Sequence, residues 1–232
     1  DLDVQYKTAF VLMHKLRASL LVHRDETPLA GAVQMDGCYT GGSLKPANRA
    51  QERVDRRLAE HRNPDRRCIL VMRETYPGDD LAQRIGGQRT LAFVVPNENQ
   101  TDVGALAARF IAPGTTISAD ESAAYDLLHG RYPMRRVNHS QEYRAADGTT
   151  INQGESYFSR FRRMEIGQHH HFGLTYLSNY ANEVAYREDT RREPNGAIFR
   201  DILSKCAHTR PQWPWCGYWQ QRNVHRAERL AA

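Results

Sequence analysis

Hydrophobic residues recur at helical spacing near the beginning of the chain and form short continuous runs further along. Between residues 4 and 23, apolar positions alternate with basic ones in a repeating stripe: Tyr6, Phe10, Leu12, Met13, Leu16 and Leu20. Intervals of three and four residues are typical of one face of an α-helix. The sequence therefore predicts an N-terminal helix.

Three apolar runs follow, each bounded by turn-forming residues, and this pattern predicts strands. They cover residues 31–39, 68–73 and 89–95. The Arg-rich stretch 43–67 between the first two contains prolines and predicts an exposed loop or a short helix.

Helical and extended patterns alternate in the second half of the chain. They predict a helix at 102–111, a strand at 115–119, a helix at 122–129, a strand at 134–138 and helices from about Gln153 and over 173–187. Asp102 is the expected cap of the first of these helices. After Thr190 the pattern fades, so 191–232 is interpreted as a tail of unknown role.

The order of these elements predicts the fold class. Three consecutive strands form an antiparallel meander, and a strand that follows a helix is expected to return parallel to the first one. This gives an α/β protein with a ribonuclease-H-like mixed five-stranded sheet and flanking helices. The predicted organisation is an N-terminal linker helix (1–28), a catalytic domain (29–190) and the tail (191–232).

The chain is basic, with a formal net charge of +5, and all but four of its 32 basic residues are arginines. Arginine binds phosphate in a bidentate manner, which favours a polyanionic ligand, although a GC-rich genome would raise the arginine content in the same way. The four cysteines form no CxxC pair, which argues against a zinc ribbon and fits a reducing cytoplasm. No apolar run approaches the length of a membrane span, so we expect no membrane partner.

An unusual acid stands within the first strand, in AVQMDGCYTGG at 32–42. Asp36 is unfavourable there unless water or a cation meets it. Asp120 ends the fourth predicted strand, beside the first, and Glu155 begins the following helix. Three converging carboxylates repel one another and favour hard cations such as Mg²⁺, and two such ions ~4 Å apart can catalyse phosphoryl transfer.

Each acid also has a simpler interpretation. An aspartate at a strand end is often a turn former, Asp120 could cap the next helix, and Glu155 could complement the helix dipole. Spacing alone therefore leaves the metal site as one of two interpretations.

Several stretches, in order along the chain, resemble the DDE transposases of bacterial insertion sequences, in their ISXO-type branch. The segments that carry the resemblance are KTAFVLMHKLR (7–17), VQMDGCYTGG (33–42), ISADESAAYDLL (117–128), VNHS (137–140), INQGESYFSRFRRMEIGQHHH (151–171) and YLSNYANEVAYRED (176–189). The resemblance implies that Asp36, Asp120 and Glu155 are the catalytic, metal-binding triad.

The resemblance also implies cofactors and partners. It predicts Mg²⁺ or Mn²⁺, as two ions, and double-stranded DNA at the element ends and at the target, bound by a homo-oligomer at the bacterial nucleoid in the cytoplasm. Members of this branch usually carry an N-terminal zinc ribbon, so recognition of the DNA ends is expected either upstream of Asp1 or lost. Two departures from the pattern, at Gly37 and at Thr150-Ile151, leave room for a decayed or domesticated copy.

Three functions are therefore kept open. The first is a transposase that cleaves and joins DNA, the second is an inactive DNA-binding or assembly protein derived from one, and the third is a nuclease of the same fold. The remaining motifs keep two interpretations each. His169-His170-His171 could be a metal site or a polar helix end. The arginines 160, 162 and 163 could contact phosphates or form a solvated face, and Trp213, Trp215 and Trp219 could stack on bases or pack within the protein.

Overall fold

The computed structural model describes residues 3–41, 47–54, 66–76, 86–137, 151–211 and Trp215. The strands are β1 (Ala32–Thr40), β2 (Arg67–Thr75), β3 (Gly87–Val95), β4 (Thr116–Asp120) and β5 (Met134–Val137). The α-helices are α1 (Tyr6–Val22), α2 (Gln100–Phe110), α3 (Asn152–Met164), α4 (Leu177–Thr190) and α5 (Asn195–His208). Shorter helical segments are η1 (Ala50–Glu52), η3 (Ala123–Gly130), η4 (Glu165–His169) and η5 (Leu174–Tyr176).

The five strands form one mixed sheet in the order β3-β2-β1-β4-β5. β1, β2 and β3 pair antiparallel, whereas β4 runs parallel to β1, and β5 runs parallel to β4. The predicted placement of the fourth strand beside the first is therefore confirmed. The helix α2 provides the crossover that such a parallel return requires, and the arrangement is consistent with a ribonuclease-H-like fold.

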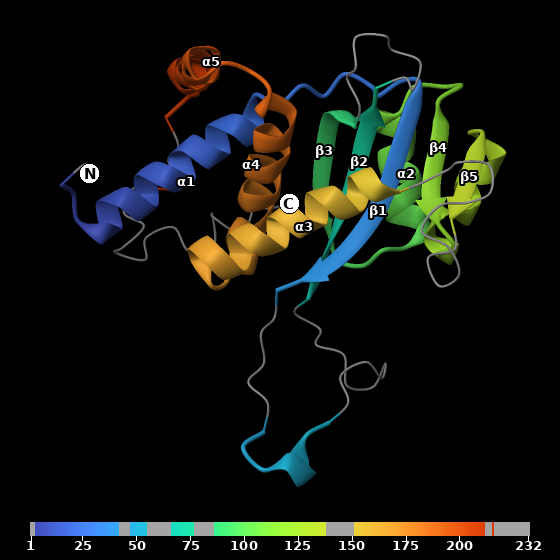
Figure 1. Cartoon of the computed structure of the whole chain (residues 1–232), viewed down its shortest axis with the longest axis horizontal. Coiled ribbons are helices and arrows are strands. Elements are labelled where there is room, and N and C mark those ends of the chain that lie inside the picture. The colour runs from blue at the N-terminus through green and yellow to red at the C-terminus, as the bar shows by residue number, and fades with distance from the viewer. Residues whose placement is uncertain are drawn as a thin grey trace.

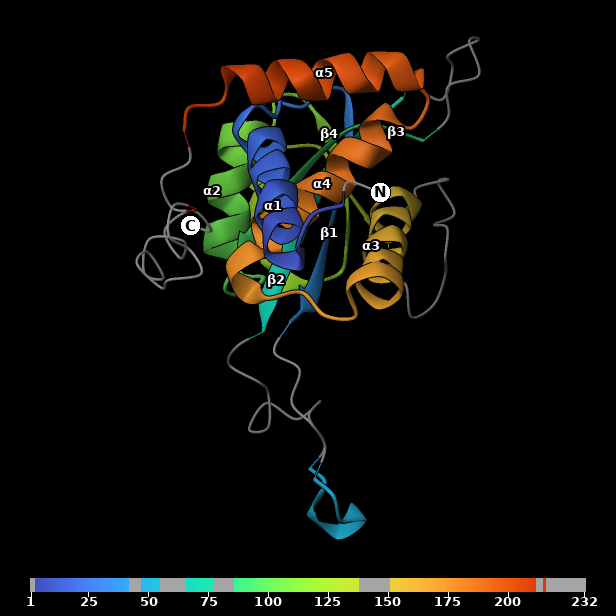
Figure 2. The ribbon, with the colours of Figure 1, turned by 90° about the vertical axis from the view of Figure 1, so that its left-hand side faces the viewer.

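Helices cover both faces of the sheet, and each face has its own hydrophobic cluster. Successive side chains of a strand point to opposite faces, so Val33 and Met35 of β1 join the cluster beneath α2 and η3. Ile69 and Val71 of β2 join the cluster beneath α3 and α4. Figure 1 shows α3 crossing in front of β1, and Figure 2 shows α2 and α3 on opposite sides of the strands.

The N-terminal helix α1 packs against α4, and a buried ion pair joins them. The Nε of Arg17 lies 2.6 Å from Oε2 of Glu183, and both side chains are almost inaccessible to water. His14, one turn earlier, is fully buried, and its ring lies against those of Tyr176, Tyr180 and Trp215. Trp215 therefore packs within the protein, as one of its two interpretations predicted.

One prediction about local structure is wrong, and one helix went unpredicted. The cap of α2 is Asn99, whose side chain accepts from the backbone N–H of Asp102 at 2.9 Å, so Asp102 lies inside the first turn. The region after Thr190 contains the helix α5, which contacts α1 and has no buried residue. Its apolar pattern is weak because it lies across the outside of the protein (Figure 2). Among the described residues, no helix is both long and apolar enough to cross a bilayer.

Candidate active site

Asp36 and Asp120 lie on adjoining strands at the point where the strands separate. The parallel pairing of β1 with β4 ends at Gln34 opposite Ser118. Asp36 and Asp120 each stand two residues further along, so they belong to the same face as this last pair. Both side chains are half-buried. The sheet therefore brings the two predicted aspartates to corresponding positions on one face of adjoining strands.

Glu155 is carried by the first turn of α3, which lies directly over Asp36. A Cβ on the preceding residue, Gly154, would come within 2.8 Å of the Cβ of Asp36. Only glycine permits this approach without a shift of the helix. The backbone N–H of Gln153 also donates to Oε1 of Gln34 at 2.9 Å. The start of α3 is thus held against β1, with the exposed Glu155 within electrostatic range of Asp36.

A fully buried arginine supports this end of α3 from below. Nη1 of Arg73, on β2, donates to the carbonyl oxygen of Gln153 at 2.7 Å, and Nη2 lies 3.4 Å from Oε2 of Glu188. The side-chain oxygen of Gln153 in turn accepts from the N–H of Gly87 at 3.0 Å. These contacts tie the first turn of α3 to β2, β3 and α4.

The surroundings of Asp36 disfavour its charged form. Burial and the negative charges of Asp120, Glu98 and Glu155 raise the pKa of Asp36 to about 7, although the N–H of Gly37 donates to Oδ1 at 2.8 Å and opposes the shift. Asp36 therefore lies within electrostatic range of the two other predicted acids and of Glu98.

Glu98 is the acid that sequence reasoning missed. It lies between β3 and α2, and the hydroxyl of Tyr125 donates to its Oε1 at 2.5 Å. Burial raises the pKa of Glu98, the hydrogen bond from Tyr125 lowers it, and the charge of Asp120 raises it. In the sequence Glu98 stands in PNENQ, a turn-like stretch, and no signal there distinguishes it from a solvated loop residue.

The carboxylates around the end of β4 lack the basic partners that other buried acids have. Glu183 is paired with Arg17 and Arg187, and Glu188 with three arginines. In contrast, Asp36, Asp120 and Glu98 accept hydrogen bonds from Gly37, Ser122 and Tyr125, and no lysine or arginine pairs with them within the described part of the chain. Partly buried carboxylates without a counter-charge are costly, so a cation would stabilise them.

The donor set fits a hard divalent cation in its chemistry. All of the donors are carboxylate oxygens, which Mg²⁺ and Mn²⁺ prefer. As they stand, no three His, Cys, Asp or Glu side chains of the described residues are arranged to hold a metal ion. Binding therefore requires these side chains to turn toward one another.

Basic groups line the β1 strand beyond Asp36. Nη2 of the exposed Arg162, on α3, lies 3.0 Å from Sγ of Cys38, and Nη2 of Arg66 donates to the carbonyl oxygen of Tyr39 at 2.9 Å. Burial raises the pKa of the Cys38 thiol, which disfavours a nucleophilic thiolate. His169 packs against Phe172 and Tyr180. His139, Trp213 and Trp219 lie outside the described residues.

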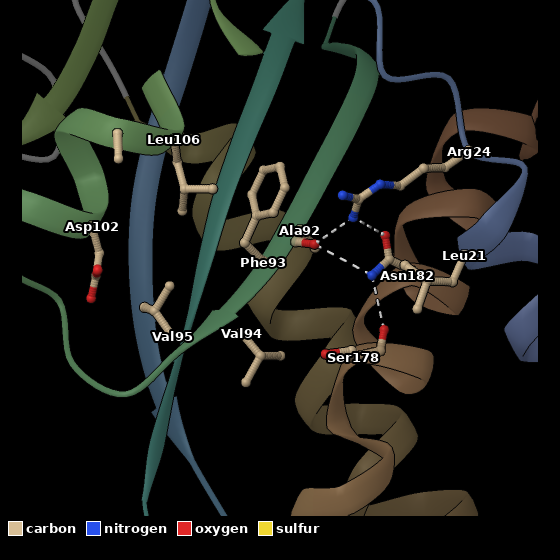
Figure 3. Close-up of a pocket in the computed structure, with 11 residues that line it drawn as sticks. Leu21, Arg24, Ala92, Phe93, Val94, Val95, Asp102, Leu106, Ser178 and Asn182 are labelled. Atoms are coloured by element: carbon tan, nitrogen blue, oxygen red, sulfur yellow. Dashed lines mark hydrogen bonds between the residues drawn. The ribbon is translucent and has the colours of Figure 1, made fainter. Parts of the chain in front are cut away.

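A pocket of about 370 Å³ lies elsewhere, between β3, α2 and α4 (Figure 3). Nη1 of Arg24 donates to the carbonyl oxygen of Ala92 at 3.2 Å and to Oδ1 of Asn182 at 3.1 Å. Among its lining residues, Asp102 is the sole acid. The described residues of this pocket therefore offer no set of carboxylates comparable to the acids on β1 and β4.

Comparison with known protein families gives one match over most of the chain. The family model described as "ISXO2-like transposase domain" matches residues 28–189. This range contains all five strands and the three predicted acids. Comparison with curated proteins gives no significant match.

Proposed function

Since the chain belongs to the ISXO2-like transposase domain family, we propose that it is a metal-dependent DNA transposase. It cleaves DNA at the ends of an insertion sequence and joins the freed 3′-hydroxyl to target DNA. The observation that carries this proposal is the pair Asp36 and Asp120, two half-buried carboxylates on adjoining strands with no basic partner in the described part of the chain.

Each residue of the site has a distinct part in this mechanism. Asp36 and Asp120 hold the cations from two adjoining strands, and Glu155 completes the ligand set from α3. Bound Mg²⁺ or Mn²⁺ supplies activation of the attacking water or 3′-hydroxyl and stabilisation of the leaving oxygen. Gly154 and Gln153 keep the first turn of α3 close to β1, so Glu155 is held near the two aspartates.

Arginines beside the site support DNA as the substrate. Arg162 reaches the neutral thiol of Cys38, two residues beyond Asp36 on β1, and its other donors can bind a phosphate. A pocket of about 310 Å³ between α3 and α4 is also lined by Arg163, together with Arg160 and Arg187, which pair with Glu188 and Glu183. Phosphate contacts of this kind position a duplex without reading its sequence.

The proposal is tested by replacing each acid with its amide. We expect Asp36→Asn, Asp120→Asn and Glu155→Gln each to lower cleavage and strand transfer by about a hundredfold or more, since each change removes charge that a cation requires. The assay uses element-end DNA with Mg²⁺ or Mn²⁺, and Glu121→Gln, an exposed neighbour of Asp120, is the control. Full strand transfer by any of the three variants would refute the assigned role.

A non-catalytic DNA-binding protein derived from such an enzyme is the second candidate. It is favoured by the finding that no three potential ligands of the described residues are arranged to hold an ion as they stand. DNA binding that weakens steeply with salt, without any metal-dependent cleavage by the wild-type protein, would establish this alternative. Cleavage without joining would instead indicate a nuclease.

A further inference from the structure

The carboxylate of Asp120 takes its direction from the turn that follows β4. Asp120 is the last residue of that strand, and its Oδ1 accepts from the backbone N–H of Ser122 at 3.0 Å. Among the described residues, this is the one hydrogen bond made to the carboxylate. The direction of the Asp120 side chain therefore depends on where the backbone of Ser122 lies.

Arg136, on β5, holds the backbone of Ser122. Its Nη2 donates to the carbonyl oxygen of Ser122 at 2.8 Å and to Oδ1 of Asp126 at 3.0 Å. The guanidinium lies over the ring of Tyr125, 5.8 Å from the ring centroid, and only 19% of the arginine side chain is exposed. Tyr125 itself is fully buried. Arg136 thus connects Ser122 to a well-packed part of the protein.

The side chains of Arg136 and Asp120 belong to opposite faces of the sheet. In the pairing of β4 with β5, Arg136 stands opposite Ala119, and Val137 stands opposite Asp120. Neighbouring residues of a strand point to opposite faces, so Arg136 approaches the turn from the side of η3, where its ion pair is with Asp126. A direct ion pair would neutralise the carboxylate of Asp120. Contact through the backbone of Ser122 fixes its direction and leaves its charge intact.

We propose that Arg136 is a positioning residue, which sets the direction of the Asp120 carboxylate through the backbone of Ser122. This inference rests on the proposed function, because it requires Asp120 to take part in DNA cleavage. The competing role for Arg136 is to hold η3 through the ion pair with Asp126, whose side chain is 55% exposed. Variants of Arg136 and of Asp126 separate these two roles.

The first test measures amide hydrogen exchange by NMR on the full chain, without DNA or metal. Arg136→Met removes both hydrogen bonds, so we expect the Ser122 amide to exchange about tenfold faster, relative to the amide of Leu70 in the buried strand β2. The Leu70 amide reports unfolding of the whole protein and corrects for any loss of stability. Asp126→Ala leaves the bond from Arg136 to Ser122 in place and should exchange at Ser122 as the wild type does.

The second test measures cleavage of element-end DNA with Mg²⁺ at several DNA concentrations. Arg136→Met should lower kcat by about tenfold or more and leave KM for DNA unchanged, because the binding surface is not altered. Arg136→Lys can still donate to the carbonyl oxygen of Ser122 and should recover part of the loss. Asp126→Ala should keep the wild-type kcat. An equal loss of kcat in Arg136→Met and Asp126→Ala would show that Arg136 only holds η3, and would overturn the inference.

Asp120→Asn separates the failure of this inference from the failure of the proposed function. If Asp120→Asn is inactive and Arg136→Met has the wild-type kcat, the role of Asp120 stands and the role of Arg136 is wrong. If Asp120→Asn cleaves DNA as the wild type does, the proposed function is wrong at this residue, and the inference about Arg136 falls with it.

Discussion

At the scale of single residues, the site depends on two glycines as well as on its acids. Gly154 lets α3 approach Asp36, and Gly37 admits the carboxylate of Glu98. A larger residue at either position would require its neighbour to shift. Two close contacts around β1 therefore depend on glycine.

Gly154→Ala should damage the site through the approach of α3. The added methyl would meet the Cβ of Asp36 at 2.8 Å, a part of that side chain that cannot rotate away. We expect a loss of about 1–3 kcal/mol in the free energy of unfolding, together with weaker strand transfer. Denaturant unfolding measures the first effect. Gly104→Ala on α2, where a Cβ meets nothing within 4 Å, should instead be neutral or stabilising.

Arg162→Gln should weaken DNA binding without any preference for sequence. If Arg162 neutralises one phosphate, its loss lowers the slope of log affinity against log salt by about 1. The slope is measured by fluorescence anisotropy with labelled duplex over a range of salt concentrations. Arg200→Gln, at an exposed position on α5, is the control. Equal slopes for Arg162→Gln and the wild type would show that Arg162 makes no phosphate contact.

The residues of the site differ in how far the sequence reveals them. Asp36 is conspicuous because it interrupts an apolar strand, and Asp120 because it ends one. Glu98, Gly154 and Arg73 give no such signal, since their importance arises from contacts between segments that are far apart in the chain. Burial of an arginine in β2 runs against its usual exposure, so hydrophobic pattern alone cannot predict it.

At the scale of elements, the order of strands and helices was sufficient to predict the sheet, and local chemistry decided the details that were missed. Asn99 and Asp102 are both good helix caps, and only the backbone geometry shows that Asn99 holds that position. The helix α5 went unpredicted because it has no buried residue and therefore a weak apolar stripe. Topology follows from alternating patterns, whereas helix ends and surface helices depend on weaker preferences.

The network beneath α3 gives a prediction at this scale. Arg73→Met leaves Glu188 buried with fewer partners and removes the hydrogen bond to Gln153, so we expect a loss of about 3–5 kcal/mol in the free energy of unfolding. Arg160→Met removes another partner of Glu188, but the side chain of Arg160 is 49% exposed, so the loss should be about 0–1 kcal/mol. Similar losses in the two variants, measured by denaturant unfolding, would contradict the importance of burial here.

At the scale of the whole molecule, segments from both ends of the described chain meet around His14. The ring of Trp215 stacks on that of His14, with centroids 5.3 Å apart and an interplanar angle of 19°. Tyr176 and Tyr180 complete the contact from η5 and α4. The stability of the whole fold is therefore expected to depend on the charge state of this buried ring.

Burial and the charges of Arg17 and His169 together lower the pKa of His14 from its ordinary value of 6.5 to about 3, against the charge of Glu183, which raises it. The unfolded chain therefore binds a proton at this residue between about pH 6.5 and about pH 3, and the folded protein does not. The free energy of unfolding should therefore decrease as the pH is lowered through this range. This group should account for a loss of about 2 kcal/mol between about pH 7 and about pH 5. Denaturant unfolding of the wild type and His14→Phe at both pH values measures the difference, and equal pH dependence would contradict the assignment.

The contacts along β3 have a consequence for how copies of the protein behave at high concentration. β3 is at one end of the sheet, where unpaired backbone groups could recruit a strand from another molecule. Asp189 instead accepts from the N–H of Thr90 at 2.8 Å, and Arg24 and Asn182 both donate to the carbonyl oxygen of Ala92. These three side chains satisfy two backbone groups of that border, so an incoming strand could not pair at Thr90 and Ala92 without displacing them.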